Sequence, residues 1–182
     1  MRIWLDQVRD EPFSWNTTET VVPAVLERPE LVDLGPVAWR GQVVHADPGF
    51  FLRARLSYEQ ALSCTRCLKV FRETTKPEVE LMILVDRARS GAGGGGERGE
   101  HELHENDLGA FYVAEEILDT DPILLEQLQL NIPMKPLCRV DCAGLCPSCG
   151  ADRNEPEACS CTESTADPRW AGLAALRERL DT

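Results

Sequence analysis

The sequence contains little histidine, few aromatic residues and no long apolar run. Only 3 of its 182 residues are histidine, and aromatic residues make up 6%. No apolar stretch approaches the roughly 18 residues that a membrane span requires, and Met1–Asp10 lacks the continuous apolar segment of a secretion signal. We therefore expect a protein of the cytoplasm, where thiols stay reduced.

Signals of common enzyme classes are also missing. The glycine run at residues 91–96 does not end in the Lys-Ser/Thr of a phosphate-binding loop. His45 lies alone beside a predicted turn, and we interpret it as a surface residue. His101 and His104 follow the glycine run, and we interpret them as a solvated pair in a loop rather than a metal-binding pair. We predict no enzymatic activity.

Basic residues are outnumbered by acidic residues. The chain has 19 Lys and Arg against 31 Asp and Glu, a net charge of −12. Phosphate backbones repel such a chain at long range. However, residues 53–76 carry six basic residues against two acidic ones, a net +4, so the remainder carries −16. We predict an RNA-facing surface from these six, the alternative being a solvated outer strand face: Arg53, Arg55, Arg66, Lys69, Arg72 and Lys76.

Alternating hydrophobicity predicts antiparallel β-structure over residues 36–86. Apolar residues alternate with polar ones from Val37 to Val43 and again from Phe50 to Leu56, with turn residues at Asp47–Gly49 between them. Further alternation follows, so we predict a meander of about four strands. The predicted class is α+β: an antiparallel sheet, open or barrel-like, with short helices and a C-terminal cysteine-rich zinc segment.

We expect two regions in the chain. Residues 1–136 form a β-rich domain with a flexible glycine-rich loop at about 88–106. Residues 137–182 form a cysteine-rich zinc-binding segment with a C-terminal helix packed on it. Asp-Pro pairs at 121–122 and 167–168 each predict a helix start, with Asp as the N-cap.

Eight cysteines are the clearest chemical feature. In a cytoplasmic chain they are better explained as metal ligands than as disulfides. Zinc binds four thiolates in a tetrahedron, and a Cys-x-x-Cys turn supplies two sulfurs on one side of the ion. The predicted ligands are Cys64, Cys67, Cys138, Cys142, Cys146, Cys149, Cys159 and Cys161.

The spacing leaves two partitions open. In the first, Cys146, Cys149, Cys159 and Cys161 form one compact site, and the other four form a second site that joins the C-terminal segment to the sheet. In the alternative, residues 138–149 supply all four ligands of one site. We favour the first, which predicts two structural Zn²⁺ ions with no open coordination position and hence no catalytic metal. An iron–sulfur cluster suits the spacing less well. A redox Cys-x-x-Cys at 64–67 would require a following helix, whereas a strand is predicted there.

Several motifs together resemble the YceD family of large ribosomal RNA subunit accumulation proteins. The resemblance rests on Cys64–Leu68, on Glu126–Cys138, on Asp141–Gly150 and on the closing Asp167–Leu173, and it extends from about residue 36 to 180. Some members lack the later cysteines, which implies that the second site is separable. Arg153, Asn154 and the glycine run depart from the family pattern.

The resemblance implies a bacterial or plastid protein needed for accumulation of 23S ribosomal RNA, with large-subunit RNA or its precursor as a partner. Two further hypotheses stay open. The acidic chain could escort a basic ribosomal protein without touching RNA, or it could be a metal-dependent RNA-processing enzyme.

Overall fold

A computed structural model describes residues 1–85, 110–156 and 159–161. The predicted glycine-rich loop, His101, His104 and the predicted C-terminal helix lie outside these residues. The division of the chain near residue 136 stays a prediction. Among the described residues, no helix is long and apolar enough to cross a membrane.

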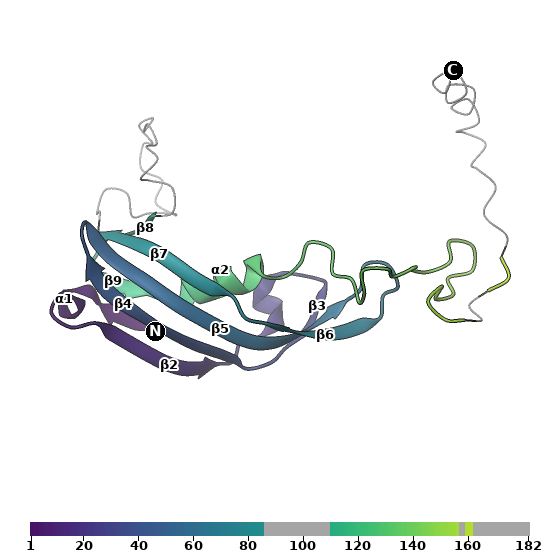
Figure 1. Cartoon of the computed structure of the whole chain (residues 1–182), viewed down its shortest axis with the longest axis horizontal. Helices are drawn as coiled ribbons and strands as arrows, with labels where there is room; N and C mark the ends of the chain where they lie inside the picture. Colours follow the sequence, from purple (N-terminus) through teal and green to yellow (C-terminus); the bar gives the residue numbers. More distant parts are fainter. Residues whose placement is uncertain (86–109, 157–158, 162–182) are drawn as a thin grey trace, which may run out of the picture.

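The centre of the fold is one long strand, β5 (Gly49–Ser63), with a broken strand on either side (Figure 1). On one side, β7 (Glu78–Val85) pairs with the first half of β5 and β6 (Val70–Thr75) with the second half, in one continuous register. On the other side, β4 (Val37–Ala46) pairs with residues 49–57 of β5 and β3 (Leu31–Leu34) with residues 60–62, with a register shift within β3.

Proline residues lie at both breaks. Pro77 separates β6 from β7 and Pro36 separates β3 from β4. Proline has no backbone N–H and cannot donate to a sheet ladder. The four strands predicted over residues 36–86 therefore occur, but β6 and β7 continue one another instead of pairing as neighbours in a meander.

The sheet is open and mixed, whereas the sequence predicted an antiparallel sheet, open or barrel-like. Its larger half has the order β2-β4-β5-β7-β8, with β2 (Phe13–Glu19) and β8 (Ala110–Val113) at the two ends. Because these end strands do not pair with each other among the described residues, no barrel forms. β8 runs parallel to β7, a direction that alternating hydrophobicity does not encode.

The N-terminus forms a second, two-stranded sheet. β1 (Arg2–Trp4) pairs with β9 (Ile117–Asp119), and a short helix, α1 (Leu5–Val8), follows β1. A 3₁₀ turn, η1 (Pro23–Leu26), precedes β3.

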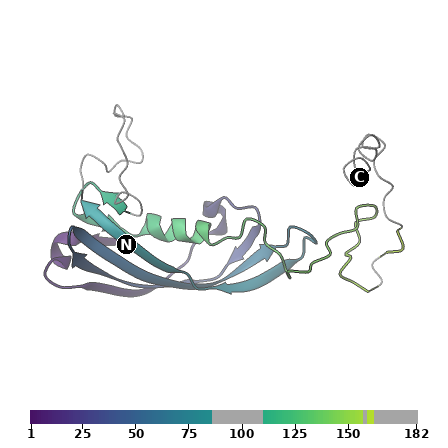
Figure 2. The ribbon, with the colours of Figure 1, turned by 45° about the horizontal axis from the view of Figure 1, so that its top comes forward.

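Helix α2 (Asp121–Leu130) covers one face of the curved sheet (Figure 2). It begins after Thr120, which occupies the N-cap position in place of the predicted Asp121. Its buried side chains Ile123, Leu124 and Leu128 join the core formed by alternate residues of β4 and β5. Each contributes about 1.5–3 kcal/mol of burial free energy. The other face of these strands, which carries the arginines of β4 and β5, is left to solvent.

Candidate metal centres

Four cysteines from distant parts of the chain meet beside the end of the sheet. Cys64 and Cys67 lie in the turn between β5 and β6, while Cys138 and Cys142 lie beyond α2. The Sγ atoms of Cys64 and Cys142 are 3.8 Å apart, and those of Cys67 and Cys138 are 3.6 Å apart. A tetrahedral zinc with bonds of about 2.3 Å requires sulfur separations of about 3.8 Å. These two separations suit one zinc ion, and all four sulfurs lie within 4.8 Å of one another.

The remaining four cysteines form a second group further from the sheet. The Sγ atoms of Cys146, Cys149, Cys159 and Cys161 lie within 4.8 Å of one another. Three of the first group's cysteines are buried, whereas in the second group only Cys146 is buried. The structure thus brings the thiols together in the favoured partition. Both groups can hold a metal ion, and the identity of the metal stays a prediction.

The two Cys-x-x-Cys turns have the same backbone hydrogen bonds. The N–H of Cys64 donates to the carbonyl of Lys69, and the N–H of Leu68 donates to the carbonyl of Cys64. In the second turn the N–H of Cys146 donates to the carbonyl of Ala151, and the N–H of Gly150 donates to the carbonyl of Cys146, at the same spacing. The residue after the second cysteine has a positive φ in both turns, 60° at Leu68 and 75° at Gly150. The first turn therefore places an exposed leucine in a conformation that normally favours glycine.

Backbone N–H groups prepare one thiol of each group for deprotonation. Burial raises the pKa of Cys64, but N–H groups of Cys138, Cys67 and Arg66 outweigh it and lower that pKa to about 6. N–H groups of Cys149 and Ser148 lower the pKa of Cys146 to about 6. The thiolate is the form that binds metal.

Other thiols in the two groups resist ionisation in the absence of a cation. Burial, followed by the neighbouring thiols, raises the pKa of Cys138 to about 12. Hydrogen bonding with Cys149 and Cys146, followed by burial, raises the pKa of Cys161 to about 12. A divalent cation would offset these effects and favour the thiolates, since a metal deprotonates the thiols that coordinate it. The donor chemistry of both groups therefore fits a metal with four thiolate ligands.

The second group is held against the first by contacts with the β5–β6 turn. The carbonyl of Arg66 accepts the N–H of Leu145 at 3.1 Å, and the guanidinium of Arg66 donates to the carbonyl of Cys142 at 2.8 Å. Lys69 pairs with Asp152 at 2.8 Å and with Glu155 at 2.7 Å. Hydrogen bonds from Lys69 lower the pKa of Asp152 to about 2. Arg66 and Lys69 therefore have structural roles in joining the two cysteine groups.

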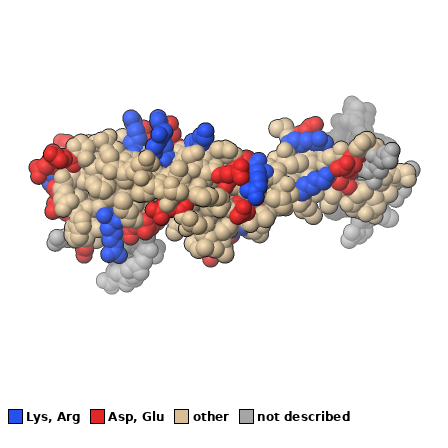
Figure 3. Space-filling model, turned by 90° about the horizontal axis from the view of Figure 1, so that it is seen from below, with Lys and Arg blue, Asp and Glu red and all other residues tan. Residues whose placement is uncertain are grey.

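The six basic residues predicted to face RNA lie in two parts of the fold, at the cysteine groups and on the outer face of the sheet. Arg66 and Lys69 lie at the cysteine groups, and Arg72 on β6 pairs with Glu59 and Asp33. Arg53 and Arg55 lie on the solvent face of β5, each paired with a glutamate of β7. On the face shown in Figure 3, basic side chains occur in small separate groups, several beside acidic ones. RNA contact by these residues stays a prediction.

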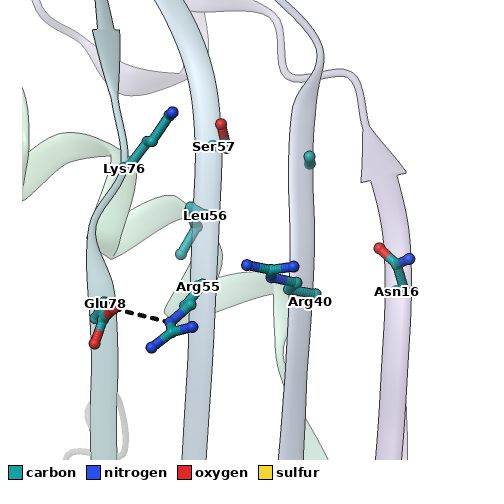
Figure 4. A pocket seen from close by; sticks show the side chains of 8 residues that line it. Asn16, Arg40, Arg55, Leu56, Ser57, Lys76 and Glu78 are labelled. Atoms are coloured by element: carbon teal, nitrogen blue, oxygen red, sulfur yellow. Dashed lines mark ion pairs between the residues drawn. The ribbon is translucent and has the colours of Figure 1, made fainter.

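One groove gathers basic residues on the sheet face opposite α2. It has a volume of about 530 Å³, and its polar lining consists of Asn16, Arg40, Arg55, Ser57, Lys76 and Glu78 (Figure 4). Sequence reasoning included Arg55 and Lys76 but missed Arg40 and Asn16. Each of these two residues follows a buried residue in a strand with alternating burial, so its side chain faces outward. Only the strand register shows that Asn16 lies opposite Arg40 and Arg40 opposite Arg55.

These features define a class: a small β-sheet protein with two four-cysteine groups able to hold metal ions. Residues 52–177, more than half of the chain, match the family described as Large ribosomal RNA subunit accumulation protein YceD. The chain belongs to the YceD family.

Relatives add no assigned activity. An uncharacterized protein of Mycobacterium bovis and uncharacterized proteins of two Mycobacterium tuberculosis strains are each 30% identical over 115 residues. That alignment covers 62% of this chain and 48% of each relative, so the chain spans about half the length of the curated relatives it matches. No solved structure matches the chain.

Proposed function

We propose that this protein is a non-enzymatic, cytoplasmic factor that holds two structural zinc ions and supports 23S ribosomal RNA accumulation during large-subunit assembly. The observation that carries the proposal is the gathering of eight thiols into two sets of four, in a chain of the YceD family. The first set joins residues 138–142 to the β5–β6 turn, so a metal there would fix the whole segment to the sheet.

Four thiolates complete the tetrahedral coordination of zinc, which supports a structural rather than a catalytic role. A catalytic zinc keeps one position for water or substrate. Zinc binding by four-ligand peptides is worth about 10–16 kcal/mol near neutral pH, which is comparable to the whole stability of a small domain. We therefore expect metal binding to hold residues 138–156 in their arrangement beside the end of the sheet.

The proposal is tested by depleting the protein in its host and measuring the ratio of 23S to 16S ribosomal RNA. Depletion should lower this ratio, and the intact gene should restore it. Variant Cys64→Ser/Cys67→Ser should fail to restore it, whereas Ser63→Ala, beside the turn, should succeed. An unchanged ratio on depletion would contradict the proposal.

A tagged pulldown separates direct RNA contact from an escort role. Ribosomal RNA that is lost on nuclease treatment would support RNA contact. One basic ribosomal protein in stoichiometric amount, retained after nuclease treatment, would identify an escort instead. Cleavage of precursor RNA by the purified, metal-loaded protein would contradict the non-enzymatic part of the proposal.

A further inference from the structure

The groove on the outer sheet face contains a like-charged pair that the fold itself does not need. Arg40 on β4 lies directly opposite Arg55 on β5 in the strand register. Directly opposite residues have Cβ atoms about 4.5–5.5 Å apart, and like charges in that relationship destabilise a sheet. Glu78 on β7 neutralises only Arg55, through an ion pair of 2.8 Å (Figure 4).

The next outward-facing position on β5 shows the usual arrangement. Arg53 lies opposite the neutral Gln42 on β4 and pairs with Glu80 on β7 at 2.8 Å. Every charge in that row has a partner. The row that contains Arg40 therefore differs from the neighbouring row on the same three strands, because Arg40 has no opposite charge beside it.

Two cations of the groove have no acidic partner among the described residues. Arg40 and Lys76 are both exposed, and no carboxylate of the described chain pairs with either. Asn16 on β2 lies opposite Arg40 and adds an amide to the groove, and Ser57 adds a hydroxyl. The lining thus offers many hydrogen-bond donors and two uncompensated positive charges, in a chain whose net charge is −12.

The groove continues along the sheet. A neighbouring hollow of about 450 Å³ shares Asn16, Arg40 and Arg55 with it and extends to Arg53. Two adjoining hollows with a row of arginines suit a chain of phosphates better than a single small anion, because a chain can reach several guanidinium groups at once. Each guanidinium can bind two oxygens of one phosphate.

We propose that this groove binds the phosphodiester backbone of RNA, through Arg40, Arg55 and Lys76. This inference rests on the proposed function, which supplies RNA as the polyanion. The outward side chains that line the groove are not aromatic, since Trp15 beside it is buried. Base stacking is therefore absent, and binding is sequence-tolerant and sensitive to salt. The acidic remainder of the surface restricts contact to this groove.

The test is fluorescence anisotropy with a labelled single-stranded RNA of about 20 nucleotides, using the full chain with its metal. The variant Arg40→Glu/Lys76→Glu is compared with a matched control, Arg2→Glu/Lys135→Glu. The control makes the same change in net charge at exposed residues outside the groove. We expect the groove variant to bind at least about tenfold more weakly and the control to change less than about twofold. The slope of log affinity against log salt should become shallower by about 1.4, at about 0.7 for each of two phosphate contacts.

Three binding results would overturn the inference. The groove and control variants could bind RNA equally. Inorganic phosphate could displace the RNA when its concentration equals that of the RNA phosphate groups. That result would assign the groove to a small anion. Two RNAs of unrelated sequence could differ more than about tenfold in affinity, which would require base contacts.

If the groove variant restores 23S RNA as well as wild type does, the inference fails and the proposed function stands. If depletion leaves 23S RNA unchanged, the proposed function fails.

Discussion

Asn154 donates a hydrogen bond from Nδ2 to the sulfur of Cys142, 3.5 Å away, and this contact joins the two cysteine groups. Cys142 is in the first group, whereas Asn154 lies in the loop between Cys149 and Cys159 of the second. The Oδ1 atom of Asn154 also accepts the N–H of Ala143 at 2.8 Å. One side chain therefore supports a sulfur of the first group and fixes the loop of the second.

Replacing Asn154 should weaken metal binding without removing a ligand. Residues that support metal ligands typically change metal affinity by about 10–100-fold when substituted. We expect Asn154→Leu to release metal from the first group faster in a chelator competition assay. The neighbouring, exposed Arg153→Ala is the control and should match wild type. Equal release from both variants would show that the contact with Cys142 is unimportant.

Loss of the first group should affect the second more than the reverse. The second group is tethered to the β5–β6 turn through Leu145 and Lys69, and this turn also carries Cys64 and Cys67. We expect Cys149→Ser to lose one equivalent of zinc and to retain the other. We expect Cys64→Ser to lose one equivalent and to hold the second more weakly. Elemental analysis before and after dialysis against a weak chelator measures both effects, and equal behaviour of the two variants would contradict this order.

Two glycines allow a matched test of the contact between the groups. Gly144 and Gly150 both have positive φ, 72° and 75°. A Cβ at Gly144 would lie 3.1 Å from the carbonyl oxygen of Arg66, whereas one at Gly150 would meet nothing within 4 Å. Alanine at either position pays the left-handed penalty of about 1–2 kcal/mol. We expect Gly144→Ala to destabilise the metal-loaded protein further than Gly150→Ala in denaturant unfolding, and equal losses would contradict the contact.

The Lys69–Asp152 pair should depend on pH in the acidic range. Because Lys69 holds the pKa of Asp152 at about 2, below its unfolded value, the pair stabilises the fold fully above about pH 4. That contribution is lost as the pH falls through 2. NMR titration of the Asp152 carboxyl should show the lowered pKa in wild type and a higher one in Lys69→Met. An unchanged value in the variant would mean that Lys69 is not the cause.

Local patterns were enough to predict the four strands between Val37 and Val85. Alternation from Val37 to Val43 and from Phe50 to Leu56 coincides with β4 and the first half of β5, because one face of each is buried. The same reasoning could not predict the parallel pairing of β8 with β7, since alternation does not encode direction. Nor could it predict where Pro36 and Pro77 would divide the long strands.

The cysteine spacing predicted the type of site better than its surroundings. In the first group the cysteines form two pairs close in sequence, Cys64–Cys67 and Cys138–Cys142, and in the second all four lie within 16 residues. The preference of zinc for four thiolates limits the possible sets. The roles of Asn154, Arg66 and Arg40 depend on contacts between segments distant in sequence or on strand register. Charge counting placed Arg66 and Lys69 with Arg53 in one basic surface, but their partners assign them to different parts of the fold.

The most direct test is the metal content of freshly purified, reduced protein, combined with X-ray absorption at the zinc edge. Two equivalents of zinc, each with four sulfur ligands at about 2.3 Å, is the predicted result. Protein that carries no metal, or zinc with an oxygen ligand in an open position, would contradict the proposal that eight thiolates hold two structural ions.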